Sequence, residues 1–408
     1  MVSGMDVLLT NMIGLLMVAI FVAIGAHRLR LPYTVGLVVT GIALAFSPFH
    51  AHVALTHDVI FNVILPPLLF EAAINIHWRD LRQDALPILS LAVLGTLIAA
   101  IFIAASMVYG LGWPLRSALL FGVLIAATDP VAVIAMFKDN GIKGRLRLLV
   151  ESESLANDGV AAVLFSLVLA WSQTAGNQTA TPGDIAQTLL VTVGGGVLSG
   201  AVFAAAAIVI AGRTADHLVE SSLTLVVAYG SFLMAERLHC SPVLATVTAG
   251  LLMGNLGILA DGEHGRISPR GREFALELWD FFAFIANSLV FLLIGLTVAG
   301  IPVRELGGRS LLIVICLVLA SRALTVYPLS LAFIKSRWRI PFNLQHVLWW
   351  GGLRGALGLA LALSLDPSLQ MRNQILVATF GVVVFSVVVQ GLTMPLMLRA
   401  TAASTRKA

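Results

Sequence analysis

Apolar runs of about twenty residues follow one another along almost the whole of this 408-residue chain. A run of that length, wound as an α-helix, matches the hydrocarbon thickness of a bilayer. Hydrophobic residues make up 59% of the chain and charged residues only 11%, whereas soluble domains carry roughly a quarter charged residues. The sequence therefore predicts an all-α polytopic membrane protein and argues against a soluble globular fold.

The hydropathy pattern predicts about thirteen transmembrane helices. Their expected extents are 6–26, 33–47, 58–76, 86–109, 115–137, 149–171, 184–211, 218–237, 242–256, 274–299, 309–334, 344–365 and 373–398. The first run lacks the flanking segments of a cleaved signal peptide, so we expect it to be retained. No connecting segment is long enough for a soluble domain, and we expect residues 1–408 to form one membrane domain.

The Lys and Arg residues predict how the helices are oriented. One set of alternate loops, together with the C-terminus, holds 18 of the 25 basic residues, the other set holds 5, and two lie within spans. Because basic residues accumulate on the cytoplasmic side, we expect the N-terminus outside and the C-terminus in the cytoplasm of a plasma or inner cell membrane.

Unusually many polar residues lie at the start of the sixth run, which opens Glu151-Ser-Glu-Ser-Leu-Ala-Asn-Asp158. At about 100° per residue, Glu153, Asn157, Ser154 and Asp158 fall within one face of a helix. Ionisable groups inside a membrane are costly and indicate a functional site. Oxygen ligands on a single helix face suit a small cation, a proton, or both in turn.

The fifth run contains Thr128-Asp129-Pro130 near its middle, which predicts a break in the helix. Such breaks in transporters leave free backbone groups that build ion sites. Asp129 is expected to cap the exposed positive helix end, and Thr128 offers a hydroxyl and a carbonyl oxygen. The alternative is a proline kink without any role in ion binding.

The twelfth run contains four glycines and an arginine between Gly351 and Gly358, which favours a second broken or very closely packed helix. Arg354 would balance exposed carbonyl ends there; the alternative is a glycine-lined packing face with a snorkelling arginine. The fifth and twelfth runs occupy matching places in the chain. This predicts two inverted six-helix repeats with crossed unwound helices, joined by the seventh run.

A second intramembrane arginine, Arg322, needs a carboxylate partner. Glu153 is the favoured partner, since this pairing leaves Asp158 free. Glu71, in the third run, is the rival, and the sequence alone does not decide between them.

Taken together, these motifs resemble a known family of transporters. Thr-Asp-Pro, Glu-Ser-Leu-x-Asn-Asp-Gly, Ser-Arg-Ala and Gly-Gly-Leu-Arg-Gly-Ala occur in this order, after Pro-Pro-Leu-Leu-Phe-Glu-Ala in the third run. The chain is similar to the sodium/proton antiporters of the cation/proton antiporter-1 family, which includes bacterial and archaeal antiporters and the animal sodium/hydrogen exchangers.

The resemblance implies an ion site centred on Asp158, which would hold Na⁺ and H⁺ in turn. Ser154 and Thr128 would add oxygen ligands to Na⁺. Asn157 stands where the electrogenic branch of the superfamily has a second aspartate, which implies the electroneutral branch. Li⁺ is expected as an alternative substrate, and no cofactor is implied.

The resemblance also implies supporting residues and an assembly. Glu153 and Arg322 would form a stabilising pair, while Asp129 would serve the crossed unwound helices. Residues 58–171 and 309–398 would hold the ion-translocation elements and the remaining helices a dimerisation scaffold. We therefore expect a homodimer in contact with membrane lipid. We also expect a role in pH homeostasis and no nucleic-acid partner.

The residues themselves predict how exchange would work. Burial disfavours the charged form of Asp158 and a bound cation favours it, so Na⁺ and H⁺ compete for one carboxylate. One charge carried either way gives electroneutral 1:1 exchange, and alternating access requires the site to cross only when it is neutralised.

Other functions were weighed against this transport mechanism. They are K⁺/H⁺ exchange, a cation channel, and an intramembrane aspartyl protease that uses Asp129 and Asp158. A cation channel would need a filter motif, and none is visible in the sequence. An intramembrane aspartyl protease would have Gly-x-Gly-Asp around its second aspartate, and the sequence around Asp158 lacks it. A transporter, and no enzyme, is the prediction.

Overall fold

The computed structural model describes residues 4–29, 31–47, 55–139, 142, 144–173, 181–214, 216–259, 267–300 and 305–405. Every regular element within these ranges is helical. The helices of the first half are α1 (Gly4–Leu29), α2 (Tyr33–Ala45), α3 (Leu65–Ile74), α4 (Trp78–Gln83), α5 (Ala85–Leu89), α6 (Thr96–Leu111), α7 (Leu115–Ala126), α8 (Val131–Asp139) and α9 (Arg145–Gln173). Those of the second half are α10 (Pro182–Ala211), α11 (His217–Arg237), α12 (Pro242–Met253), α13 (Pro269–Val298), α14 (Gly308–Ala332), α15 (Phe342–Trp350), α16 (Ala356–Leu363), α17 (Arg372–Phe385) and α18 (Gly391–Thr405).

Membrane crossing is supported by the length and apolar character of these helices. Nine helical segments of the described chain are long and apolar enough to span a membrane, and three shorter apolar ones accompany them. Each predicted run overlaps a helix or a set of consecutive helical segments. The chain is thus an all-helical, polytopic membrane protein, while the count of thirteen spans stays a prediction.

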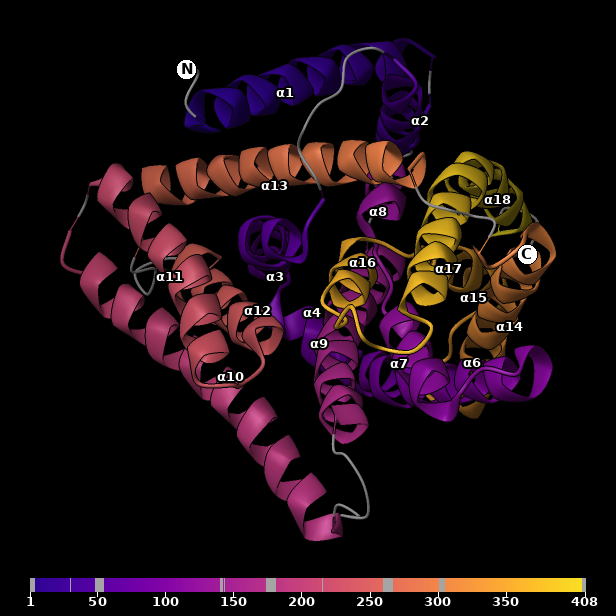
Figure 1. The fold of residues 1–408 in the computed structure, drawn as a ribbon. Coiled ribbons are helices and arrows are strands. Elements are labelled where there is room, and N and C mark those ends of the chain that lie inside the picture. Colours follow the sequence, from indigo (N-terminus) through magenta and orange to yellow (C-terminus); the bar gives the residue numbers. More distant parts are fainter. Residues whose placement is uncertain are drawn as a thin grey trace.

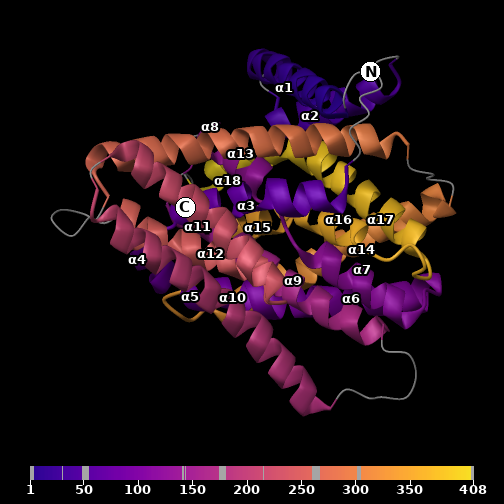
Figure 2. The same cartoon turned by 60° about the vertical axis from the view of Figure 1, so that its left-hand side comes forward.

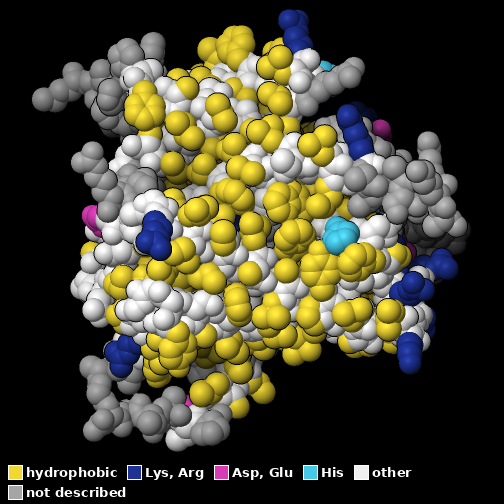
Figure 3. Space-filling model, turned by 90° about the vertical axis from the view of Figure 1, so that its right-hand side faces the viewer, with side chains coloured by type: hydrophobic (Ala, Val, Ile, Leu, Met, Phe, Trp, Pro, Cys, Tyr) yellow, Lys and Arg dark blue, Asp and Glu magenta, His cyan; other side chains and the backbone are white. Residues whose placement is uncertain are grey.

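Large apolar side chains cover the outside of the molecule, as expected of a surface that faces lipid. Phe21, Leu190 and Leu198 are 67%, 74% and 64% exposed. Figure 3 shows a broad apolar face with most Lys and Arg side chains near its margins. In a soluble protein an apolar patch of this extent would promote association.

The helices form two bodies. The first, here called the scaffold, consists of α1–α3 and α10–α13, and the second, the bundle, consists of α5–α9 and α14–α18. In Figures 1 and 2, α13 crosses the molecule beside α3. Figure 1 shows α6, α7 and α14–α18 together on the side away from α10–α12. The bundle and scaffold meet where α9 touches α3, α10 and α12, and where α2 and α13 lie against residues 386–390 and α17.

Close backbone contacts hold the scaffold together. A Cβ on Gly41 of α2 would run into the Leu292 carbonyl, and a Cβ on Gly295 of α13 would run into the Val38 carbonyl. Glycine at both positions lets the two helix backbones touch. In the Gly194-Gly195-Gly196 run of α10, Gly195 and Gly196 lie against Cys240 and Ser241, whereas Gly194 faces open space.

The α3 helix packs with the scaffold although sequence reasoning grouped it with the translocation elements. It lies against α12 and α13. A Cβ on Gly250 of α12, or on Gly254 directly after α12, would meet the backbone of α3 at Phe70 or Ile74. This packing places α3 on the scaffold side, where it faces the bundle.

Candidate functional site

Two helix breaks meet inside the bundle. The fifth run divides into α7 and α8 with residues 127–130 between them, and the twelfth divides into α15 and α16 with residues 351–355 between them. Both predicted breaks are therefore confirmed. They touch directly, because the Asp129 N–H donates a 2.8 Å hydrogen bond to the Leu353 carbonyl.

Charged side chains satisfy the free helix ends at these breaks. The Val131 N–H, at the start of α8, donates to Asp129 Oδ1 at 2.9 Å. Arg354 Nη1 donates to the carbonyls of Ala126 and Ala127, at the end of α7, at 2.6 and 2.9 Å. A negative group thus faces a helix N-terminus and a positive group faces a helix C-terminus, the arrangement that the helix dipole favours.

The structure pairs Arg322 with Glu153 rather than with Glu71. Arg322 Nη1 and Nη2 each donate to one Glu153 carboxylate oxygen at 2.8 Å, and both side chains are buried. Arg322 also donates from Nε and Nη2 to the Leu348 carbonyl near the end of α15. Glu71 instead accepts a 3.0 Å hydrogen bond from Asn75 Nδ2.

Two glycines of the second break make room for these charged groups. A Cβ on Gly352 would lie 2.6 Å from Arg322 Nε. A Cβ on Gly355 would overlap the Asp129 carboxylate. The glycine-rich sequence therefore allows charged side chains of α14 and of the first break to lie against the second break.

A closed hydrogen-bond network joins α9 to the first break. Ser154 Oγ donates to the Thr128 carbonyl at 2.5 Å, and Thr128 Oγ1 donates to Ser154 Oγ at 3.2 Å. Asn157 Nδ2 donates to Thr128 Oγ1 at 2.7 Å and to Glu153 Oε1 at 3.3 Å. The Thr128 N–H donates to Asn157 Oδ1 at 3.2 Å. These side chains therefore fix the broken segment on α9.

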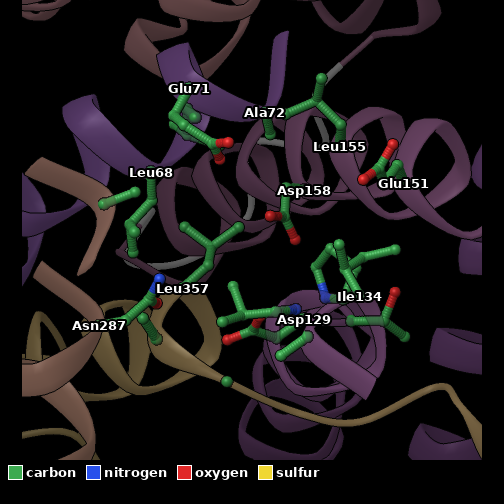
Figure 4. A pocket seen from close by; sticks show the side chains of 18 of the residues that line it. Leu68, Glu71, Ala72, Asp129, Ile134, Glu151, Leu155, Asp158, Asn287 and Leu357 are labelled. Carbon is green, nitrogen blue, oxygen red and sulfur yellow. The ribbon is translucent and has the colours of Figure 1, made fainter. Parts of the chain in front are cut away.

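Asp158 lies outside this network. Its Oδ1 atom is buried and has no hydrogen-bond partner within the described residues. Figure 4 shows its carboxylate projecting into a cavity that Asp129, Glu71 and Glu151 also line. An unpartnered buried carboxylate oxygen is costly, so this position is primed to bind a cation or a proton.

The cavity has a volume of about 290 Å³ and lies between the two bodies. The bundle contributes the first break, parts of α8, α9 and α16, and the scaffold contributes parts of α2, α3 and α13. Asp280 of α13 lines the cavity and is exposed, so the cavity reaches the surface there. The cavity thus connects Asp158 with the surface of the molecule.

The predicted ion ligands separate into two groups. Thr128 and Asp158 line the cavity, whereas Ser154 and Asn157 do not. Ser154 borders a second, smaller space together with Glu153 and Arg322. Within the described residues no group of three or more His, Cys, Asp or Glu side chains is placed to hold a metal ion, so carboxylate, hydroxyl and carbonyl oxygens are the available ligands.

Apart from Glu71, sequence reasoning did not single out the polar residues of the scaffold wall. Thr34, Asn75 and Asn287 line the cavity from α2, from the end of α3 and from α13. Asn287 interrupts the apolar stretch Phe-Ala-Phe-Ile-Ala-Asn-Ser-Leu-Val, which was a signal in the sequence. Neutral polar residues are common within spans, and only the fold shows which of them face this cavity.

Comparisons with known proteins agree with this arrangement. The family model described as "Sodium/hydrogen exchanger, transmembrane" matches residues 15–400. The Na⁺/H⁺ antiporter ApNhaP of Aphanothece halophytica is 42% identical over 368 residues, which cover 90% of this chain and 68% of that protein. The Na⁺/H⁺ antiporter NhaP of Pseudomonas aeruginosa is 36% identical over 350 residues, which cover 84% and 81%.

The fold has a counterpart among solved structures. The sodium proton antiporter MjNhaP1 from Methanocaldococcus jannaschii superimposes with a TM-score of 0.73 at 19% identity, over 97% of this chain and 99% of that chain. At this level of identity the similarity concerns the fold.

Proposed function

Because the chain belongs to the sodium/hydrogen exchanger family, we propose that it is a secondary active transporter that exchanges Na⁺ for H⁺ across the membrane. The relatives that the chain matches are Na⁺/H⁺ antiporters and not enzymes, and they favour neither K⁺/H⁺ exchange nor peptide hydrolysis at Asp129 and Asp158. The observation that carries the proposal is the unpartnered carboxylate oxygen of Asp158 at the cavity.

The exchange is proposed to be electroneutral, one Na⁺ for one H⁺. Three carboxylates (Asp129, Glu153 and Asp158) and two guanidinium groups (Arg322 and Arg354) surround the breaks, so one negative charge remains. One Na⁺ or one H⁺ neutralises it. Since an unneutralised carboxylate is too costly to carry through apolar surroundings, only the loaded site crosses.

The Na⁺ ligands are proposed to be Asp158, Thr128 and Ser154, with Asn157 beside them and Li⁺ as a second substrate. The Ser154 hydroxyl donates to the Thr128 carbonyl, and each of these two oxygens keeps a lone pair that is able to coordinate a cation. We propose that a hydrated cation first meets Asp158 in the cavity and exchanges its waters for these oxygens afterwards. Glu153, Arg322, Asp129 and Arg354 would then hold the breaks in place around it.

Alternating access is proposed to arise from movement of the bundle against the scaffold. The cavity with Asp158 lies between these bodies, so their relative motion would close it on one side and open it on the other. Since α3 packs with the scaffold, we propose that the moving body begins near Ala85 rather than at residue 58. The two inverted six-helix repeats remain part of this proposal.

The proposed topology sets the direction in which the cavity opens. With the N-terminus outside and the C-terminus in the cytoplasm, Arg147 and Asp280 lie toward the cytoplasmic ends of α9 and α13, and both line the cavity. The structure would then represent a state open to the cytoplasm. We also propose that the protein forms a homodimer through the scaffold, contacts lipid of the cell membrane and has a role in pH homeostasis.

Reconstituted protein tests the function. Proteoliposomes with a pH gradient are given Na⁺, Li⁺ or K⁺, with and without an ionophore that collapses voltage. We expect Na⁺ and Li⁺ to dissipate the gradient at a rate that does not depend on voltage, and Asp158→Asn to abolish this movement. Exchange by Asp158→Asn at the wild-type rate would refute the role of this carboxylate, and a voltage-dependent rate would refute 1:1 exchange.

A further inference from the structure

The scaffold wall of the cavity carries buried oxygens to which the proposed mechanism assigns no role. Thr34 Oγ1 and Asn287 Oδ1 have no hydrogen-bond partner within the described residues, as is also true of Asp158 Oδ1. All three residues line the same cavity. Figure 4 shows Asn287 on the side of the cavity away from α9, with Asp158 projecting inward from α9.

These unpartnered atoms lie beside a space that is large enough for a hydrated ion. A buried oxygen without a partner costs free energy that a water molecule or a cation recovers. The cavity of about 290 Å³ has room for several waters, each of which occupies about 30 Å³. A cation that keeps part of its hydration shell can therefore be held from both walls.

The α13 helix presents a continuous face to this space. Asp280, Ala283, Phe284 and Asn287 all line the cavity, and their spacing of three to four residues places them along one side of a helix. Asp280 is exposed at the mouth and Asn287 lies farther along the helix. An ion that enters past Asp280 therefore meets Asn287 on the scaffold wall.

We propose that Asn287 is a positioning residue whose amide oxygen holds the hydrated cation, or one of its waters, on the scaffold side of the cavity while Asp158 holds it on the bundle side. The inference rests on the proposed exchange and names a ligand that this exchange did not include. Because Asn287 belongs to the scaffold and Asp158 to the bundle, the two act together only while the cavity is open. Asn287 therefore sets the affinity for Na⁺ on the cavity side alone.

Everted and right-side-out membrane vesicles test this by measuring the KM for Na⁺ from each side. We expect Asn287→Ala to raise the KM about three- to tenfold from the cavity side, with less than a twofold change from the other side and an unchanged maximum rate. Asn287→Asp, which keeps an oxygen at the same place, is expected to have a KM no higher than that of the wild type.

Asn62 provides a matched control, since its Oδ1 is also buried and has no hydrogen-bond partner in the described part of the chain, but the residue does not line the cavity. Asn62→Ala is expected to leave both KM values unchanged. A KM within twofold of wild type for Asn287→Ala on both sides would overturn the inference, and so would equal increases on both sides in the Ala and Asp variants. Failure of the wild type itself to exchange Na⁺ for H⁺ would overturn the proposed function and this inference together.

Discussion

Glu153 and Asp158 stand five residues apart on α9, yet their surroundings are opposite. Both oxygens of Glu153 accept from Arg322 at 2.8 Å, and Asn157 adds a further bond. Asp158 Oδ1 has no hydrogen-bond partner among the described residues and its side chain faces the cavity. The difference supports the roles proposed above, in which Glu153 holds the helices together and Asp158 is available for exchange.

The division follows from the geometry of α9. Taking Glu153 as 0° and about 100° per residue, Asn157 and Ser154 lie at about 40° and 100° and face the first break. Asp158 and Leu155 lie at about 140° and 200° and line the cavity. The polar face that the sequence predicted is thus two adjacent stripes, and a single step around the helix separates structural from exchange groups.

The largest expected effect comes from breaking the buried pair. Arg322→Met removes the charge at similar length and leaves Glu153 buried at 2% exposure without its ionic partner. Removing one member of such a pair destabilises by about 3–5 kcal/mol. Unfolding of the purified protein in detergent, by heat or denaturant, measures the change in the free energy of unfolding.

The Arg147–Glu151 pair on the same helix is the matched control. Its side chains are 29% and 16% exposed, and it spans one helical turn. Arg147→Met is expected to cost less than about 1 kcal/mol. The double variant Glu153→Gln/Arg322→Met should recover much of the lost stability. If Arg322→Met were no less stable than Arg147→Met, the pair would have no structural role.

A smaller effect is expected at Asn157, which joins the paired region to the first break. Asn157→Asp keeps the acceptor for the Thr128 N–H but replaces the amide nitrogen that donates to Thr128 Oγ1 and Glu153 Oε1. A carboxylate then lies against another carboxylate, and we expect a loss of about 1–3 kcal/mol in the free energy of unfolding. The same unfolding measurement applies.

Asn75 offers the comparison at the cavity wall, since its Nδ2 donates to Glu71 Oε1 at 3.0 Å in a half-buried position. Asn75→Asp creates a similar contact between carboxylates at a position that water reaches more readily. Its loss in the free energy of unfolding should therefore be smaller than that of Asn157→Asp. Equal losses for Asn75→Asp and Asn157→Asp would show that burial of the network adds nothing.

Much of this fold could be predicted from the sequence because its signals are local. Hydropathy located the helical runs, and Pro130 and the glycines around Arg354 marked both breaks. The sequence favours Glu153 over Glu71 as the partner of Arg322 but does not decide between them, because the choice depends on how the helices pack. The same holds for the cavity, since the turn of α13 that brings Asn287 toward α9 depends on contacts between distant helices.

The assignment of α3 to the scaffold also depends on contacts between distant helices, which the sequence does not predict. Its Pro-Pro-Leu-Leu-Phe-Glu-Ala sequence predicts that α3 belongs with the ion-translocation elements, and Glu71 does line the cavity. Its packing, however, depends on Gly250 of α12 and on Gly254 directly after it, almost two hundred residues later in the chain. A residue can therefore belong to the site while its helix belongs to the scaffold.

The smallest effect on stability is expected at Asp158, although we propose this residue as the centre of exchange. Asp158→Asn removes a buried charge that has no ion pair and puts a neutral side chain of nearly the same shape in its place. We expect the free energy of unfolding in Na⁺-free buffer to change by less than about 1 kcal/mol, or to rise, because an unpartnered carboxylate does not stabilise the fold. Adding Na⁺ should stabilise the wild type and not the variant, since a ligand stabilises only the protein that binds it. A loss as large as that of Arg322→Met would mean that Asp158 is a structural group, and the contrast between the two carboxylates of α9 would fail.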